Sequence, residues 1–104
     1  MKYNKLIRDY IPEIIKRNGG EAITRTLTDE EFKEYLEKKL DEEVAEFHES
    51  KSIEELADIL EVVYALTHVY GSESVYLTRL RKLVERGGFH KKILLIETID
   101  KQEE

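Results

Sequence analysis

The sequence predicts a mainly α-helical fold, an antiparallel helical bundle that carries one short two-stranded β-ribbon. Apolar residues recur at the three- and four-residue spacing of an amphipathic helix over residues 29–49 and again over residues 53–70. Two short segments near residues 21–27 and 91–99 are instead rich in β-forming residues and predict the ribbon. At this length the chain is expected to form a single domain, residues 1–104.

The first predicted helix follows Asp9, which is a suitable N-cap residue. Pro12 lies in its first turn, where the missing N–H group costs little. The glycines at 19–20 end the helix, because glycine readily adopts the left-handed conformation found after helix C-termini. Lys5 and Arg8 precede this helix in a segment that is predicted to be extended or turned.

A long helix is predicted from Thr28 onward and runs to about residue 49. Thr28 and Glu31 have the spacing of a capping box, in which each residue bonds to the backbone of the other. The residues at 50–52 then make a turn, so that the next helix runs antiparallel to this one.

The next helix is capped by Ser52 and ends at Gly71. Ser52 places Glu55 at the third helical position, which gives Glu55 an alternative structural role as a capping partner. The last helix is predicted over residues 72–86, and the two glycines at 87–88 stop it.

Negative charge is concentrated between Asp41 and Glu61. This stretch holds nine acidic residues and one basic residue, whereas the whole chain carries a formal charge of −6. Four of the acids lie on helical faces that are otherwise apolar. A carboxylate on a buried face is costly unless it is paired or bound to a metal. These four acids are Glu43, Glu46, Glu55 and Asp58.

The spacing of the four acids predicts that they meet. Glu43 and Glu46 are three residues apart, as are Glu55 and Asp58, so each pair projects from one side of its helix. With a turn near residues 50–52, Glu46 faces Glu55 and Glu43 faces Asp58. Four oxygen donors at one level suit a hard divalent cation such as Mg²⁺. The structural alternative is that these acids lie on solvated helix faces, where such spacing is common.

The acidic motif at residues 42–58 reads Glu-Glu-x-x-Glu and then Glu-x-x-Asp. It resembles the motif of the all-α nucleoside triphosphate pyrophosphohydrolases, the MazG-like superfamily. The N-terminal YNKLIRDYIPEII and the Arg-Gly-Gly-Phe at 86–89 resemble its phosphoribosyl-ATP pyrophosphohydrolase-like subgroup. The resemblance covers nearly the whole chain. One departure is the spacer of eight residues at 47–54, which is shorter than in typical members.

The resemblance implies a Mg²⁺-dependent nucleotide pyrophosphohydrolase of the house-cleaning type, with Mn²⁺ as a substitute ion. Water attacks the α–β phosphoanhydride of a nucleoside triphosphate and releases a nucleoside monophosphate and pyrophosphate. In this interpretation Glu43, Glu46, Glu55 and Asp58 bind the metal. Glu42 or Glu46 orients or deprotonates the water.

Lys5, Arg8 and Arg86 are the candidates for neutralising the phosphate charge. Arg86 directly precedes the glycines at 87–88, whose backbone N–H groups can approach a phosphate closely. The structural alternative for these glycines is a simple helix stop. For Lys5 and Arg8 the alternatives are surface charge or pairing with the acidic helices.

Composition narrows the classes of function. The acidic balance argues against nucleic-acid binding, which requires Lys and Arg to neutralise phosphates. The chain has no cysteine for a disulfide or a thiolate metal site. It has no membrane-spanning run and no signal-peptide pattern, so a cytoplasmic protein without a membrane partner is expected. The helix over residues 53–70 is apolar around most of its circumference, which predicts a homo-oligomer, either a dimer or a tetramer.

Two other functions stay open at the level of sequence. The phosphoribosyl-ATP pyrophosphohydrolase of histidine biosynthesis shares the chemistry but requires a different pocket for the base and the ribose. A non-catalytic helical oligomerisation module would use the same acids in salt bridges. The sequence does not predict base or sugar specificity, nor the number of metal ions.

Overall fold

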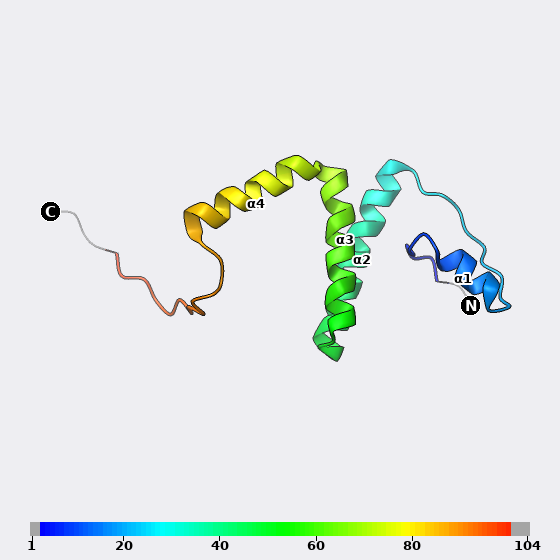
Figure 1. Ribbon diagram of the computed structural model, residues 1–104, viewed down its shortest axis with the longest axis horizontal. Helices are drawn as coiled ribbons and strands as arrows, with labels where there is room; N and C mark the ends of the chain where they lie inside the picture. Colours follow the sequence, from blue (N-terminus) through cyan, green and yellow to red (C-terminus); the bar gives the residue numbers. More distant parts are fainter. Residues whose placement is uncertain (1–2, 101–104) are drawn as a thin grey trace. The chain divides into compact units, whose positions relative to one another are not determined.

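The computed structural model describes residues 3–100 and confirms the mainly α-helical class. These residues divide into two compact units, one up to Ser72 and one from Glu73. Figure 1 labels the four helices of the described residues, and α2 and α3 form a helix pair in the first unit. The described chain contains the helices α1 (Ile11–Arg17), α2 (Asp29–Ser50), α3 (Ile53–Tyr70) and α4 (Ser72–Arg86).

The first unit is built on an antiparallel hairpin, in which α2 and α3 pack side by side (Figure 1). α2 begins with the predicted capping box. The Glu31 N–H donates to Thr28 Oγ1 over 3.2 Å, and the Thr28 N–H donates to Glu31 Oε1 over 3.0 Å. Lys51 makes the tight turn in the left-handed conformation, with φ of 54°. The turn therefore falls where the sequence predicts it.

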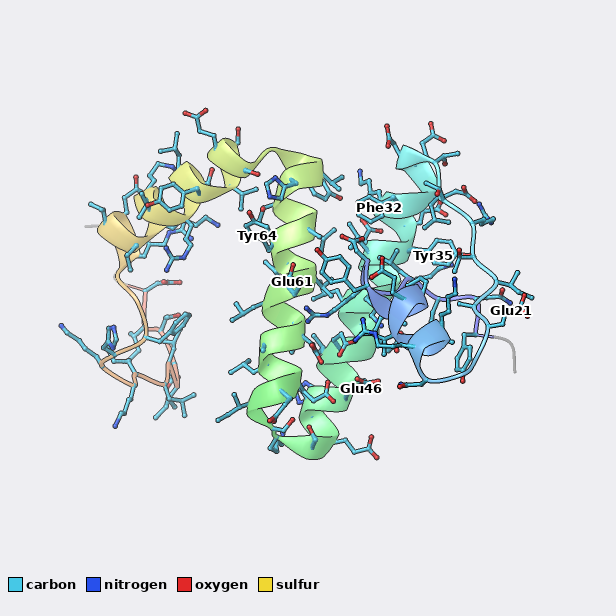
Figure 2. All side chains as sticks on the ribbon, turned by 45° about the vertical axis from the view of Figure 1, so that its right-hand side comes forward. Glu21, Phe32, Tyr35, Glu46, Glu61 and Tyr64 are labelled. Carbon is cyan, nitrogen blue, oxygen red and sulfur yellow. The ribbon has the colours of Figure 1, made fainter. Side chains whose placement is uncertain are left out.

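The interior of the hairpin is small. Leu36 on α2 and Val62 on α3 are the buried apolar side chains of the described chain, with 3% and 8% of their surface exposed. Much of the apolar surface of α3 is open to solvent, and Tyr64 lies on the side of α3 away from α2 (Figure 2). Further exposed apolar residues of α3 are Ile53, Leu56, Leu60 and Val63.

α1 is a short helix with Pro12 in its first turn, as the sequence predicts. Its N-cap residue is Tyr10 rather than Asp9, and no side-chain hydrogen bond caps it. Within the first unit α2 and α3 are the helices that pack on each other, so the described residues up to Ser72 form a hairpin with an attached N-terminal segment, not a closed bundle.

The predicted β-ribbon is absent from the described chain. Residues 21–27 and 91–99 are assigned to no strand, and the apolar residues Ile23 and Ile96 are 95% and 89% exposed. A two-stranded ribbon is marginal unless an apolar surface covers it. The two segments also belong to different units, and neither unit supplies a second strand of its own.

The second unit contains most of α4 and the segment that follows it. Gly87 has φ of 79°, and its N–H donates to the Leu83 carbonyl over 2.9 Å. This is the left-handed C-terminal geometry that glycine favours, so Gly87 stops the helix as predicted. None of the helices in residues 3–100 has the length and apolar character needed to span a membrane.

Candidate metal centre

Three carboxylates from the two helices of the hairpin converge on one point. Glu43 projects from α2, and Glu55 and Asp58 project from α3. One oxygen of each lies within 4.8 Å of the others. The antiparallel packing produces this meeting, because residues at equal distances from the turn face each other. Glu43 is buried, with 6% of its surface exposed, and the other two are half-buried.

Glu46, the fourth predicted ligand, stands beside this group rather than within it. It is half-buried on α2, toward the turn of the hairpin (Figure 2). Its carboxylate interacts with that of Glu55. Glu46 and Glu55 therefore face each other, as predicted. The tightest cluster, however, is the three-carboxylate group of Glu43, Glu55 and Asp58.

Two buried oxygens of this group have no hydrogen-bond partner. They are Glu43 Oε2 and Glu55 Oε2. A buried carboxylate oxygen without a donor is costly, so such atoms are normally paired, protonated or bound to a cation. Desolvation raises the pKa of Glu55 to about 7, with further contributions from hydrogen bonding to, and repulsion by, Glu46 and Glu43. Near neutral pH Glu55 is therefore partly protonated.

The hydrogen bonds at the start of α3 show how far Glu55 acts as a capping partner. The Glu55 N–H donates to Ser52 Oγ over 3.2 Å, so its main chain takes part in the cap. The Ser52 N–H, which would bond to the Glu55 carboxylate in a capping box, donates instead to Ser50 Oγ over 3.2 Å. The carboxylate of Glu55 is therefore free of the cap and turned to the other acids.

Two cationic side chains contact the outer edges of the three-carboxylate group. Arg8 Nη2 lies 2.6 Å from Asp58 Oδ1, and Lys39 Nζ lies 3.3 Å from Glu43 Oε1. For Arg8, predicted to bind phosphate, the structure shows the alternative of pairing with an acidic helix. Lys39 was not predicted from the sequence, although its position four residues before Glu43 is the helical spacing of an ion pair.

Lys5 and Glu42 are brought together beside this group. Lys5 Nζ lies 3.4 Å from Glu42 Oε1, and Lys39 Nζ lies 3.7 Å from the same oxygen. Lys5 therefore also pairs with an acidic helix. Glu42, predicted as a catalytic residue, faces the N-terminal segment and the two lysines.

The donor set fits a hard divalent cation. All three clustered groups supply oxygen, which Mg²⁺ and Mn²⁺ prefer. Arg8 and Lys39 each occupy one oxygen of Asp58 and Glu43, yet the buried oxygens Glu43 Oε2 and Glu55 Oε2 remain available. The oxygen chemistry of these residues is thus compatible with such an ion.

Arg86 is the exposed last residue of α4 and belongs to the second unit. The conformation of Gly87 is explained by the helix stop. A phosphate role for Arg86 stays a prediction.

Comparisons with protein-family models, with curated proteins and with solved structures find no match for this chain. The resemblance to MazG-like enzymes therefore rests on the motif residues, and the arrangement of those residues is what bears on function.

Proposed function

We propose that this chain is a Mg²⁺-dependent nucleoside triphosphate pyrophosphohydrolase of the MazG-like type. It hydrolyses the α–β phosphoanhydride and releases a nucleoside monophosphate and pyrophosphate. The observation that carries the proposal is the pair of buried oxygens without partners, Glu43 Oε2 and Glu55 Oε2, in a group of three carboxylates. A purely structural salt-bridge network gains nothing from acid oxygens that are buried and unpaired.

The proposed roles follow the positions of the side chains. Glu43, Glu55 and Asp58 hold the ion, and Glu46 is the fourth ligand from the same hairpin. When bound, Mg²⁺ or Mn²⁺ would supply Lewis-acid stabilisation of the phosphate charge. Glu46 is better placed than Glu42 to accept the proton of the attacking water, because Glu42 Oε1 is contacted by two ammonium groups.

The cationic side chains near the site are proposed to neutralise the phosphate groups of the substrate. Lys5 and Arg8 pair with acids of the hairpin, and in the reaction they exchange these carboxylates for phosphate oxygens of the substrate. Arg86 is proposed to assist from the basic end of α4. Lys5 and Arg8 thereby supply two of the positive charges that a bound triphosphate requires, and Arg86 adds a third.

A nucleotide panel tests the proposal. Wild-type protein with Mg²⁺ is expected to release pyrophosphate from at least one nucleoside triphosphate, with phosphoribosyl-ATP assayed alongside. Glu55→Gln should lower the rate by about 100-fold or more, since it removes a charged metal ligand. Glu54→Gln, the same change on the exposed neighbour, should keep it. Equal rates in the two variants would refute the proposed metal centre.

A second candidate is the non-catalytic helical module, which is favoured by the ion pairs Arg8–Asp58, Lys39–Glu43 and Lys5–Glu42. The two candidates differ in their response to ligands. An enzyme is stabilised by Mg²⁺ through mass action, whereas a module held by salt bridges is not. A thermal-shift titration with Mg²⁺ and then nucleotide separates them.

We further propose that the protein is a cytoplasmic homo-oligomer. The exposed apolar face of α3 exceeds what a small hairpin can cover, and oligomerisation is the usual solution. Light scattering on the wild type and on Leu60→Glu tests it. The substitution should yield monomers, and a wild-type monomer would contradict the proposal.

A further inference from the structure

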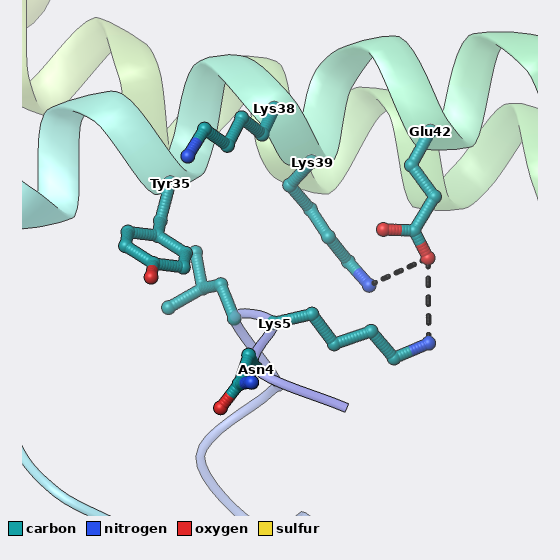
Figure 3. A pocket seen from close by; sticks show the side chains of 7 residues that line it. Asn4, Lys5, Tyr35, Lys38, Lys39 and Glu42 are labelled. Carbon is teal, nitrogen blue, oxygen red and sulfur yellow. Dashed lines mark hydrogen bonds and ion pairs between the residues drawn. The ribbon is translucent and has the colours of Figure 1, made fainter. Parts of the chain in front are cut away.

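The two compact units differ in how far their side chains find partners. In the first unit α2 packs on α3, and charged groups pair within the chain, as Lys5 and Lys39 do with Glu42 (Figure 3). In the second unit Leu80 is half-buried, and every other described residue from Glu73 onward is exposed. The described part of the second unit therefore has no core of its own.

A unit this small needs a further source of stability. Chains shorter than about 40 residues usually fold only with disulfides, a metal ion or oligomerisation. The chain has no cysteine, and the cluster of possible metal ligands among the described residues lies in the first unit. Packing against a partner is the source of stability that remains.

The apolar surface of the second unit is gathered in two places. Four consecutive residues of the segment 91–99 are each at least 75% exposed, namely Ile93, Leu94, Leu95 and Ile96. A second patch lies on α4, and its exposed residues include Tyr76, Leu83 and Val84. Exposed apolar patches of this kind mark interaction surfaces.

The backbone of the segment 91–99 is also open to a partner. The Lys92 N–H donates to the Phe89 carbonyl over 3.2 Å in a turn, with φ of 57° at Lys92. After this turn, residues 93–99 make no backbone hydrogen bond to any other described residue. Isoleucine and threonine, which recur in this segment, favour strands. The unpaired N–H and C=O groups of such a segment are a template for a strand from another chain.

The charges at the two ends of the segment identify a second copy of this chain as the partner. Lys91 and Lys92 precede the apolar run, and Glu97 and Asp100 follow it. Two antiparallel copies place the lysines of each beside the acids of the other, whereas parallel copies place like charges together. Antiparallel self-pairing also obeys two-fold symmetry, in which both copies contribute the same surface.

We propose that residues 91–99 of two copies pair as antiparallel strands, with residues 94–96 near the two-fold axis and the α4 helices covering the ribbon. A two-stranded ribbon is marginal unless a helix packs on it, and the apolar patch of α4 supplies that cover. The pairing rests on the homo-oligomer of the proposed function. Because the ribbon is short, it forms between copies that are already held together by their α3 faces.

The absence of cysteine makes this pairing testable by single-cysteine cross-linking of the full chain under mild oxidation. The fastest of Leu94→Cys, Leu95→Cys and Ile96→Cys should form a disulfide-linked dimer at least about tenfold faster than Ile99→Cys. In antiparallel copies the two 99 positions lie about 20 Å or more apart, beyond the roughly 7 Å that a disulfide spans. Lys16→Cys on exposed α1 gives the rate of chance collisions. Equal rates at 94–96 and 99, or rates no higher than that of Lys16→Cys, would overturn the inference.

Charge reversal tests the orientation. Glu97→Lys combined with Asp100→Lys makes both ends basic and should slow cross-linking of the fastest cysteine variant about fivefold, the effect of losing symmetry-related cross-strand ion pairs. Adding Lys91→Glu and Lys92→Glu makes the facing ends opposite in charge again and should restore the rate. A loss that persists after all four substitutions would contradict antiparallel pairing.

The inference and the proposed function fail in different ways. Pyrophosphate release by a protein whose 94–96 variants do not cross-link would uphold the enzyme and overturn the pairing. Rapid cross-linking at 94–96 without nucleotide hydrolysis would uphold the pairing and overturn the enzyme. An oligomer in light scattering that does not cross-link at 94–96 would overturn the pairing and leave the α3 face as the interface.

Discussion

Glu55 should make cation binding depend on pH close to neutrality. Desolvation, with hydrogen bonding to Glu46 and Glu43, raises its pKa to about 7. A divalent ion binds the carboxylate and must displace the proton, so the apparent Kd increases by a factor of 1 + 10^(pKa − pH). This factor is about elevenfold at pH 6, about twofold at pH 7 and about 1.1 at pH 8. The Kd for Mg²⁺ should therefore tighten about tenfold from pH 6 to pH 8.

Calorimetry in buffers with different ionisation enthalpies measures both the affinity and the protons released. Release should fall from about 0.9 proton per ion at pH 6 to about 0.1 at pH 8. Glu55→Gln should bind more weakly and lose the pH dependence, while Glu54→Gln should keep both properties of the wild type. A wild-type Kd that is equal at pH 6 and pH 8 would refute the assignment of Glu55 as a ligand with a raised pKa.

The stability of the ion-free protein should vary with pH in the opposite sense. The pKa of Glu55 is raised above its ordinary value of 4.5, so the folded state binds this proton more tightly than the unfolded state. That contribution is complete below about pH 4.5 and is lost as the pH rises through about 7. In the absence of ions, Tm should decrease from pH 5 to pH 8, and saturating Mg²⁺ should offset the decrease.

Further predictions concern single side chains. Thr28→Ala removes the α2 capping box and should cost about 1 kcal/mol in chemical denaturation. The pKa of Glu31 is lowered to about 2, first by its hydrogen bond with Arg25, so its stabilising contribution should be lost between about pH 4.5 and pH 2 in acid titration. Leu36→Ala empties a buried position and should cost about 3 kcal/mol, measured in the same way. Arg8→Gln should tighten Mg²⁺ binding about fivefold in calorimetry without nucleotide, because it removes a competing cation from its carboxylate partner.

The helices could be predicted from the sequence because their borders are set locally. Thr28 and Glu31 form their capping box within one turn, and Gly87 ends α4 through its own backbone conformation. The position of the turn at Lys51 followed from the caps on either side. The border of α1 lies one residue later than predicted, because Tyr10 is the N-cap residue and no side chain caps the helix.

The convergence of the acids was predictable in part. Antiparallel pairing and three-residue spacing place Glu43 opposite Asp58 and bring Glu46 close to Glu55. The position of Glu46 outside the tightest group could not be predicted from helical periodicity. It depends on side-chain rotamers and on how closely the two helices approach. Sequence reasoning also treated the cations separately from the acids, so the contact between Lys39 and Glu43 was missed.

The β-ribbon was the least predictable element, since pairing between residues 21–27 and 91–99 depends on contacts far apart in the chain. Alternation and β-forming residues indicate that a segment can form a strand, but a strand also needs a partner and a covered face. Each segment has a strongly exposed apolar side chain, for example Ile23 and Ile96. The alternation of residues along each segment therefore indicates its apolar character but does not determine its structure.

Folding and ligand binding are linked in the hairpin. Its buried positions are Leu36, Val62 and Glu43, so one of the three is an acid with an oxygen that lacks a partner. A small interior gains little apolar burial, and each buried acid subtracts from that gain. A cation that binds the carboxylates in the folded state would make their contribution to stability favourable, because it stabilises the folded state by mass action. The acids that destabilise the ion-free hairpin are thus the groups through which a bound ion would stabilise it.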